Sequence, residues 1–510
     1  MKNSIQKLVV CFLLLSGTAF SYTISGKKYL TDGSQADVQN ACSAAPDDGS
    51  ITVVIPDGTF SWSGTLTINH SLTLAGASSN GAVIQNADAT NPMISAVSSA
   101  NGNINIYWLN VVQVVDNGGT SSAGQLACDR TEPSSYTVLV HDCTFDTTTY
   151  FTYAVWVSAN GVIFWNDNFP ATGAGPTNLT GISFSCGKYG FTSSWNAPDS
   201  YGIEDTTGLM NSYVENCSFA NGSSFACDFD DNSRVVWRYN TMQDSMCGNH
   251  GQESSPYGAR EFEIYNNTFN LTSGNPNNVN EWVIFRGGSG VCFNNTMQDI
   301  PDKTGITLTV LSINRDLCQT AYPAARQTGQ GWSAASNLTY GHPVVTEDGT
   351  GDVTEGDYIW GNTGTETTDP NYVSLDQYSP DDCGNGELVT NFLIEGRDYF
   401  VGTAKPNYTP YQYPHPLHTA FAVGNPSPTP TPVSYSVWEN SFYSAMDSVG
   451  IRPSRITEVQ TWIASNPPTS QSGSYSVWEN SLFSAMQAIG IWPKHITDVQ
   501  TWVQSNPPRP

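Results

Sequence analysis

A four-residue pattern recurs at intervals of about 25 residues through the middle of the chain, and a period of that size is typical of units that stack on one another. Its copies are Asp142–Phe145, Asn166–Phe169, Asn216–Phe219, Tyr239–Met242, Asn266–Phe269 and Asn294–Met297. The interval between the second and third copies is about twice the others, so we expect two coils there, with a degenerate copy between them. The pattern predicts a solenoid.

Each copy follows a short strand-like segment, such as Val235–Trp237 or Glu263–Tyr265. Asparagine at one position per coil can form a ladder of side-chain amide hydrogen bonds along the stack, and the Phe or Met that ends each copy can fill the interior. Helical periodicity is nearly absent from residues 22–420, where Gly, Asn, Ser and Thr separate short strands. We therefore predict an all-β domain over residues 22–420.

This organisation resembles the right-handed parallel β-helix of the pectin lyase-like superfamily, and the resemblance covers most of residues 25–400. The segments Val54–Phe60, Leu66–Ile68 and Leu72–Gly76 are similar to the opening coils of such proteins. The resemblance implies the fold. It does not name a reaction, because lyases, hydrolases and adhesins all use this architecture.

The chain is strongly acidic, with a formal net charge of −26, although only 13% of its residues are charged and 12% are aromatic. The aromatic content supplies enough apolar surface for a buried core, which excludes a disordered polyelectrolyte. No run of Lys or Arg occurs, and an acidic surface does not attract phosphates. Nucleic acid is therefore not an expected partner.

The first 21 residues are typical of a signal peptide. Lys2 and Lys7 precede the apolar run Leu8–Leu15, and small residues lead to a cleavage site after Ser21. We expect a secreted protein without a membrane-spanning segment, since no later stretch is long and apolar enough.

An even number of cysteines remains after Cys11 is removed with the signal peptide, and in an oxidising compartment this favours some disulfides. The spacing gives no connectivity, and the lack of any CxxC pair argues against zinc. These cysteines are Cys42, Cys128, Cys143, Cys186, Cys217, Cys227, Cys247, Cys292, Cys318 and Cys383.

The composition changes after Phe421. Residues 421–433 are a Pro/Thr-rich linker, and residues 434–468 recur, with most positions identical, as residues 474–508. Each copy begins with a capping box, contains two amphipathic segments and ends in Pro-Pro, which predicts two small α-helical hairpins. A hairpin this short buries little core, so each is expected to pack on its twin, on the β-helix or on another protein. They are either modules that attach to a protein or cell-surface partner, or inert stabilising appendages.

Charged side chains lie at similar distances before three successive copies of the repeat, so the stacking should bring them together on neighbouring strands, about 4.8 Å apart. They are Asp228 and Asp230, then His250 and Glu253, and then Arg286. Each also has a structural interpretation, because Asp commonly caps backbone N–H groups at turns and His-Gly is often a surface turn.

This cluster fits a lyase that cleaves a uronate-containing polysaccharide by β-elimination. Asp228, Asp230 and Glu253 could hold Ca²⁺ as hard oxygen ligands. Arg286 or Arg260 could pair with the sugar carboxylates, and His250 titrates in the right range for a base. For stacking on sugar rings, the aromatic candidates are Trp237, Tyr257 and Trp282.

The segments Glu261–Thr268, Phe285–Gly288 and Asn294–Asn295 are similar to the strand pair around the active site of chondroitinase B and alginate lyases. In that family a lysine precedes the first segment and an arginine lies in the second. Arg286 matches the arginine, whereas the lysine position falls near Gly258 and no lysine is close by. The resemblance therefore leaves the base unassigned.

Two other functions remain open. Asp230-Asp231 followed by His250-Gly251 is similar to signatures of polygalacturonases, which are inverting glycoside hydrolases with paired carboxylates, although the family's Asn-Thr-Asp and Arg-Ile-Lys motifs are absent. The third alternative is a non-catalytic glycan-binding or surface-attachment protein.

Overall fold

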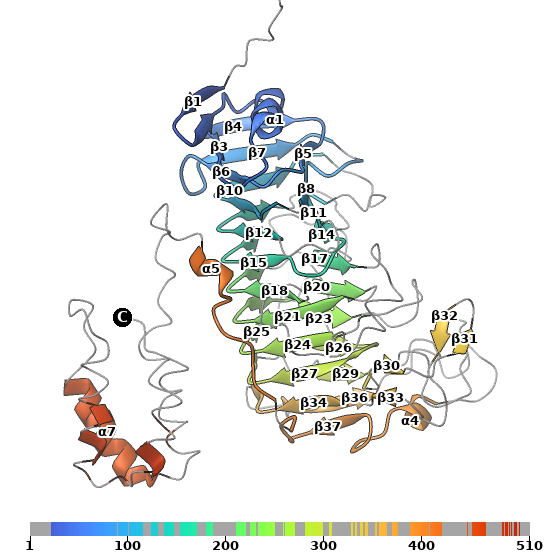
Figure 1. Ribbon diagram of the computed structural model, residues 1–510. Helices are drawn as coiled ribbons and strands as arrows, with labels where there is room; N and C mark the ends of the chain where they lie inside the picture. The colour runs from blue at the N-terminus through green and yellow to red at the C-terminus, as the bar shows by residue number, and fades with distance from the viewer. Residues whose placement is uncertain are drawn as a thin grey trace, which may run out of the picture. The chain divides into compact units, whose positions relative to one another are not determined.

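A computed structural model shows a tall stack of β-coils (Figure 1). The structure describes residues 22–115, 124–130, 137–146, 153–170, 180–186, 211–220, 225–230, 233–249, 259, 261–270, 281–298, 305–308, 356–364, 370–375, 388–420 and 451–465, except residues 89, 100 and 407, together with short stretches between 328 and 353, residue 446 and positions between 482 and 499. The chain forms two compact units, which meet in sequence between His415 and Pro416.

Three long sheets form the sides of the stack, and nearly all of their strand pairs are parallel. Sheet A contains β1 (Thr23–Ser25), β2 (Lys28–Leu30), β3 (Thr52–Ile55), β6 (Thr73–Gly76), β9 (Ile104–Tyr107), β12 (Val138–His141), β15 (Ile163–Trp165), β18 (Ser212–Glu215), β21 (Arg234–Arg238), β24 (Glu261–Tyr265), β27 (Ser289–Phe293), β34 (Asp357–Trp360) and β37 (Tyr399–Val401). Sheet B contains β4 (Gly58–Trp62), β7 (Ala82–Asn86), β10 (Leu109–Gln113), β13 (Thr144–Asp146), β16 (Asn168–Pro170), β19 (Ser218–Ala220), β22 (Thr241–Gln243), β25 (Thr268–Asn270), β28 (Thr296–Gln298) and β35 (Thr363–Gly364).

Sheet C contains β5 (Leu66–Ile68), β8 (Ile94–Ser98), β11 (Leu126–Arg130), β14 (Tyr153–Val157), β17 (Thr180–Ser185), β20 (Phe225–Asp230), β23 (Met246–Asn249), β26 (Val283–Phe285), β29 (Ile306–Leu308) and β36 (Val373–Leu375). Two small antiparallel pairs lie outside these sheets: β30 (Trp332–Ser333) with β33 (Asp352–Val353), and β31 (Asn337–Thr339) with β32 (His342–Val344). Each coil contributes one strand to each long sheet, which confirms the predicted right-handed parallel β-helix.

The recurring four-residue pattern is the corner between sheets A and B. Its first residue adopts a left-handed backbone, with φ of 57° at Asn166, 56° at Asn216 and 55° at Asn266. Asn and Asp enter this region at lower cost than other L-residues, because their short side chains can hydrogen-bond locally. The repeat therefore marks a sharp turn in each coil.

The second residue of the pattern forms the predicted amide ladder. Asn240 N–H donates to Asn267 Oδ1 at 2.9 Å, and Asn267 N–H donates to Asn295 Oδ1 at 3.0 Å. The Asn267 side chain also donates to the carbonyl of Trp237 at 2.8 Å. Each asparagine side chain thus satisfies two backbone groups of the preceding coil that water cannot reach.

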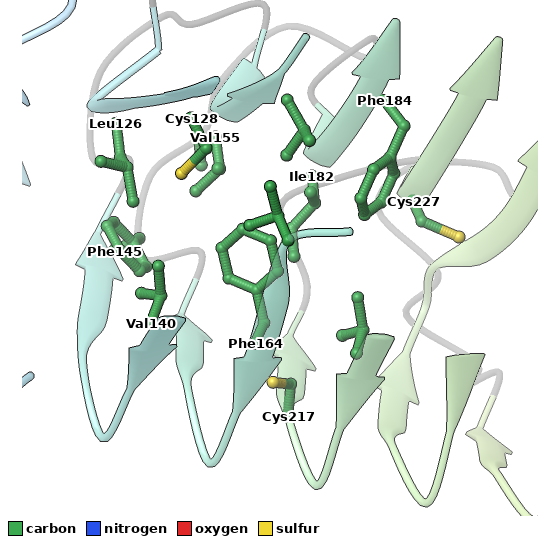
Figure 2. Packing of buried hydrophobic residues seen from close by; sticks show 14 of the residues in the cluster. Leu126, Cys128, Val140, Phe145, Val155, Phe164, Ile182, Phe184, Cys217 and Cys227 are labelled. Carbon is green, nitrogen blue, oxygen red and sulfur yellow. The ribbon is translucent and has the colours of Figure 1, made fainter. Parts of the chain in front are cut away.

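The last residue of the pattern points into the interior, as predicted. The rings of Phe145 and Phe169 stack at 5.3 Å, and those of Phe169 and Phe219 at 4.5 Å. Figure 2 shows how side chains from successive coils, among them Phe145, Phe164 and Phe184, meet between the sheets. This continuous apolar stack holds the coils together.

The prediction of two coils between the second and third copies is wrong. Strand β16 pairs directly with β19, with Phe169 opposite Phe219, and β17 pairs directly with β20. The copies at Phe169 and Phe219 therefore belong to consecutive coils of the stack.

The sequence pattern also missed α1 (Gln35–Ala44), which packs on β3 and β5 at the first coil. Ser34 caps this helix by accepting a hydrogen bond from Asp37 N–H. Its buried Val38 and Ala41 join the apolar core, so the helix covers the open end of the stack. The short helices α4 (Val389–Phe392) and α5 (Leu417–Ala420) follow near the end of the β-helix sequence.

The predicted disulfides are not formed among the described cysteines. Eight of them are free and buried, and they pack as small apolar side chains. They are Cys42, Cys128, Cys143, Cys186, Cys217, Cys227, Cys247 and Cys292. Cys318 and Cys383 lie outside the described residues.

The second unit, from Pro416 onward, contains α7 (Pro453–Ser465), which lies where the first hairpin's second helix was predicted. Its core joins the two sequence copies: Met446, Ile451 and Val459 of the first share one buried cluster with Met486, Ile491 and Val499 of the second. Of the three packing partners considered for the hairpins, the described residues show contact between the two copies. In the described part of the chain, no helix has the length and apolar character needed to cross a membrane.

Candidate functional site on sheet C

The outer face of sheet C carries two of the predicted metal ligands. Along β20, Cys227 and Phe229 are buried, whereas Asp228 and Asp230 are partly exposed. Because successive side chains of a strand point to opposite faces, both carboxylates project from the outside of the β-helix.

Arg286 lies at the end of a strand of the same sheet, two strands away. Asp228 pairs with Gly248 on β23, and Gly248 pairs with Ile284 on β26. Two strand steps correspond to about 10 Å. The stacking therefore does bring Asp228, Asp230 and Arg286 onto one sheet, on strands separated only by β23, and their roles remain predictions.

Asn249 fixes the backbone on which Arg286 stands. This buried side chain accepts the Arg286 N–H at 2.6 Å and donates to the carbonyl of Gly287 at 2.9 Å. Both contacts are made with backbone atoms, so Asn249 orients the backbone of this segment without using the Arg286 guanidinium. The arginine itself is half-buried.

Aromatic rings that the sequence interpretation missed flank the carboxylates. Phe225 lies over Gly248, where an added Cβ would meet its ring at 2.4 Å. On β14, Tyr153 and Trp156 are partly exposed and meet edge to face at 5.1 Å. These residues could have been recognised from the alternation of inward and outward side chains along each strand of sheet C. That alternation can be assigned only once the register of the sheet is known.

The two carboxylates affect the pKa of Tyr153. Burial, together with the negative charges of Asp228 and Asp230, raises the pKa of its phenol above the ordinary value. The phenol therefore stays protonated at neutral pH and can donate a proton or a hydrogen bond.

Two of the predicted stacking residues are wrong. Trp237 points into the interior, where its indole N–H donates to the Met242 sulfur at 3.4 Å, and it is 0% exposed. Trp282 is also 0% exposed. Neither ring can meet a sugar, because both surfaces of each ring are already covered by protein.

The remaining candidates lie outside the described residues: His250, Glu253, Tyr257 and Arg260. His250 directly follows Asn249, the last residue of β23. Glu261 and Glu263 of the lyase-like segment belong to β24 in sheet A, whereas Arg286 follows β26 in sheet C. The similar segments thus sit on two different sheets.

The described residues do not by themselves form a calcium site. No group of three His, Cys, Asp or Glu side chains able to hold a metal is found among them. Asp228 and Asp230 supply two hard oxygen donors, and Ca²⁺ takes six to eight. A calcium site here would depend on Glu253.

Comparison with known proteins adds similarity of fold only. No protein-family model and no curated protein matches this chain. Among solved structures it is similar to an alginate lyase from Paenibacillus sp. str. FPU-7, with 11% identity over 69% of this chain and 99% of that one, at a TM-score of 0.34. It is similar to the A-module of the Azotobacter vinelandii mannuronan C-5 epimerase AlgE4, with 14% identity over 68% and 96% of the two chains and a TM-score of 0.35.

A pectin methylesterase from Aspergillus niger is also similar, with 13% identity over 70% of this chain and 93% of that chain and a TM-score of 0.28. These values are too low to assign a reaction. The fold itself rests on the strand pairing described above.

Proposed function

We propose that the chain is a secreted protein that acts on polysaccharide, and that it is a lyase cleaving a uronate-containing chain by β-elimination. The supporting observation is the outer face of sheet C, where Asp228 and Asp230 lie two strands from Arg286 and partly exposed aromatic rings lie on the same sheet. Cleavage of an acidic sugar chain needs a cation that binds the sugar carboxylate and an acid–base group that moves a proton of the sugar ring. An apolar aromatic surface binds the sugar rings by stacking.

The chemistry divides among these groups. In β-elimination a cation offsets the charge of the sugar carboxylate, which makes the C5 proton more acidic. A base removes that proton, the C4–O bond breaks, and the leaving oxygen takes up a proton. Arg286 suits the first role, because a guanidinium can bind a carboxylate through two parallel hydrogen bonds.

The base comes from the strand next to Arg286. His250, one residue beyond Asn249, is proposed as the base, since imidazole titrates near neutral pH. Tyr153 lies on β14, four strands and roughly 19 Å from β26, so it is proposed to hydrogen-bond a neighbouring sugar, and the leaving oxygen takes its proton from water. Ca²⁺ is proposed as an additional cation: Asp228, Asp230 and Glu253 would hold it, and it would supply further positive charge opposite the sugar carboxylate.

One observation favours inverting hydrolysis as a second candidate. Asp228 and Asp230 are two residues apart on one face of β20, which separates their Cα atoms by about 6.6 Å. Inverting hydrolases hold their two carboxyl groups roughly 6.5–9.5 Å apart, with water between one of them and the sugar.

Product analysis separates these functions. The mature full-length protein is incubated with pectate, alginate, chondroitin and neutral glycans while ultraviolet absorbance and reducing ends are followed together. A lyase raises both, because it creates an unsaturated uronate without consuming water. New reducing ends alone would replace the lyase proposal with the hydrolase. Glycan binding without either product would identify a non-catalytic glycan-binding protein.

A further inference from the structure

The outer face of sheet A is covered by the chain that follows its last strand. After β37, residues 403–415, here called the strap, run back past β34, β27, β24 and β21 to β18 (orange trace beside these strands in Figure 1). Residue 407 lies outside the described residues. None of the strap's described residues belongs to a strand of sheet A. Side chains therefore hold it, and no β-ladder does.

Arg238 is the central contact of the strap. Its guanidinium donates to the carbonyl of Tyr411 at 2.7 Å and to that of Gln412 at 2.6 Å. The same group donates to Tyr265 Oη at 2.7 Å and forms an ion pair with Glu215, and both ion-pair side chains are 0% exposed. If the strap were removed, water would have to replace the two carbonyl groups that accept hydrogen bonds from this guanidinium.

Glu215 and Asn216 hold the far end of the strap. The second carboxylate oxygen of Glu215 accepts the His415 N–H at 3.1 Å, and Asn216 Oδ1 accepts the Tyr413 hydroxyl at 2.6 Å. The Tyr413 ring stacks on Tyr239 at 3.7 Å. This stack and the Glu215 contact fix the level of the β-helix at which the strap ends.

Tyr408 holds the near end. Its hydroxyl donates to Glu263 Oε2 at 2.8 Å, and its ring meets Phe293 edge to face at 5.6 Å. The strap is therefore pinned at three separate levels of the stack by groups on the outer face of sheet A.

We propose that the strap is a docked segment that opens as a unit while the β-helix stays folded, and that its opening uncovers the outer face of sheet A from β18 to β34.

Segments that are held by side-chain contacts and by no regular backbone ladder can open locally below the global unfolding free energy. The strap fits this description, because its described contacts are made by side chains of sheet A. The β-helix beneath it keeps its own ladder and its apolar interior in either state.

Hydrogen exchange of the full chain tests the proposal. Arg238→Lys keeps the charge opposite Glu215 but loses the forked contacts to Tyr411 and Gln412. We expect strap peptides to exchange at least tenfold faster, with peptides of β18, β21 and β24 as protected as in the parent protein. Tyr413→Ala gives the same readout from the strap side, because it keeps both residues of the buried ion pair and removes the ring that lies 5.3 Å from the Arg238 guanidinium.

Gln412→Ala is the matched control, because Gln412 is exposed and contacts Arg238 only through its carbonyl. Its strap should exchange like that of the parent protein. If strap protection is unchanged in both Arg238→Lys and Tyr413→Ala, or falls only together with that of β18–β24, the strap is an integral part of the β-helix and the proposal is wrong.

Discussion

The carboxyl group of Asp167 occupies the ladder position that the amide of Asn267 holds three coils further on. Asp167 Oδ1 accepts the Cys143 N–H at 2.8 Å, just as Asn267 Oδ1 accepts the Asn240 N–H at 2.9 Å. The amide has a second group that donates to a carbonyl, whereas Asp167 Oδ2 has no hydrogen-bond partner among the described residues. An ionised carboxylate cannot make that donation.

Asp167→Asn should therefore stabilise the protein at neutral pH, by roughly 1–3 kcal/mol for one buried polar group that gains its partner. Burial, with a smaller contribution from Asp142, raises the pKa of Asp167 well above its ordinary value. Because folding raises its pKa, Asp167 makes its full contribution to stability below the unfolded-state pKa near 3.9. This contribution is lost as the pH rises through the pKa that Asp167 has in the folded protein. The advantage of Asn should thus grow from pH 4 to pH 8. Thermal unfolding across this range checks it, and an advantage independent of pH would contradict the argument.

Asn267→Ala should destabilise the β-helix. It removes the acceptor of the Asn240 N–H and the donor to the Trp237 carbonyl, and both groups are buried. Two unsatisfied backbone groups cost about 2–4 kcal/mol together. Asn168→Ala is the control, because Asn168 is exposed and should change stability by less than about 0.5 kcal/mol. Equal thermal midpoints for the two variants would argue against the ladder as a source of stability.

The corner between sheets A and B could be predicted because its signals are local. A left-handed Asn, an inward amide and an inward Phe or Met occupy three of four consecutive positions, as at Asn266, Asn267 and Phe269. Their period identified the solenoid. It did not give the number of coils between Phe169 and Phe219, because connection length is independent of the stacking geometry.

The side-chain directions of sheet A could not be predicted in the same way. Every residue of β21 is buried, so the strand shows no alternation of polar and apolar residues. Its outer face is covered by a segment more than 170 positions away, as the Arg238 contact with Tyr411 shows. From the sequence alone, Trp237 could therefore not be distinguished from an exposed aromatic residue. Its place three residues before the ladder residue Asn240 was the clue to its inward direction.

Docking of the strap should weaken at alkaline pH. Burial, and then the negative charge of Glu261, raise the pKa of Glu263 to about 8, while Tyr408, Arg238 and Lys405 lower it. The contribution to docking is complete below the ordinary pKa near 4.5 and is lost as pH rises through about 8, because the docked strap keeps water from the ionised carboxylate of Glu263.

Strap protection factors, corrected for the intrinsic pH dependence of exchange, should fall several-fold between pH 6 and pH 9. In Glu263→Gln, which cannot ionise, the same factors should stay constant over this range. A parallel decline in both proteins would assign the effect to another group.

Removal of divalent cations tests the predicted calcium. Asp228 and Asp230 require Glu253 as a third ligand, and such a site prefers Ca²⁺ over the smaller Mg²⁺, which demands strict octahedral geometry. We expect EDTA to lower turnover of the acidic polysaccharide at least tenfold, and added Ca²⁺ but not Mg²⁺ to restore it. Unchanged turnover in EDTA would mean that Arg286 alone provides the cation.

Replacing Arg286 should remove turnover and leave the fold intact. Its backbone contacts with Asn249 do not involve the side chain, so Arg286→Ala keeps them and should change the thermal midpoint by only a few degrees. Loss of a cation that stabilises developing charge typically costs 10²–10³ in rate, and we expect at least a hundredfold drop in kcat/KM. Arg286→Lys retains the charge but not the paired hydrogen bonds of the guanidinium, and it should recover part of the lost kcat/KM.

Arg455→Ala is the control, because Arg455 pairs with Glu458 in the C-terminal unit, and its turnover should equal that of the parent protein. Full activity in Arg286→Ala would move the reaction away from this face of sheet C.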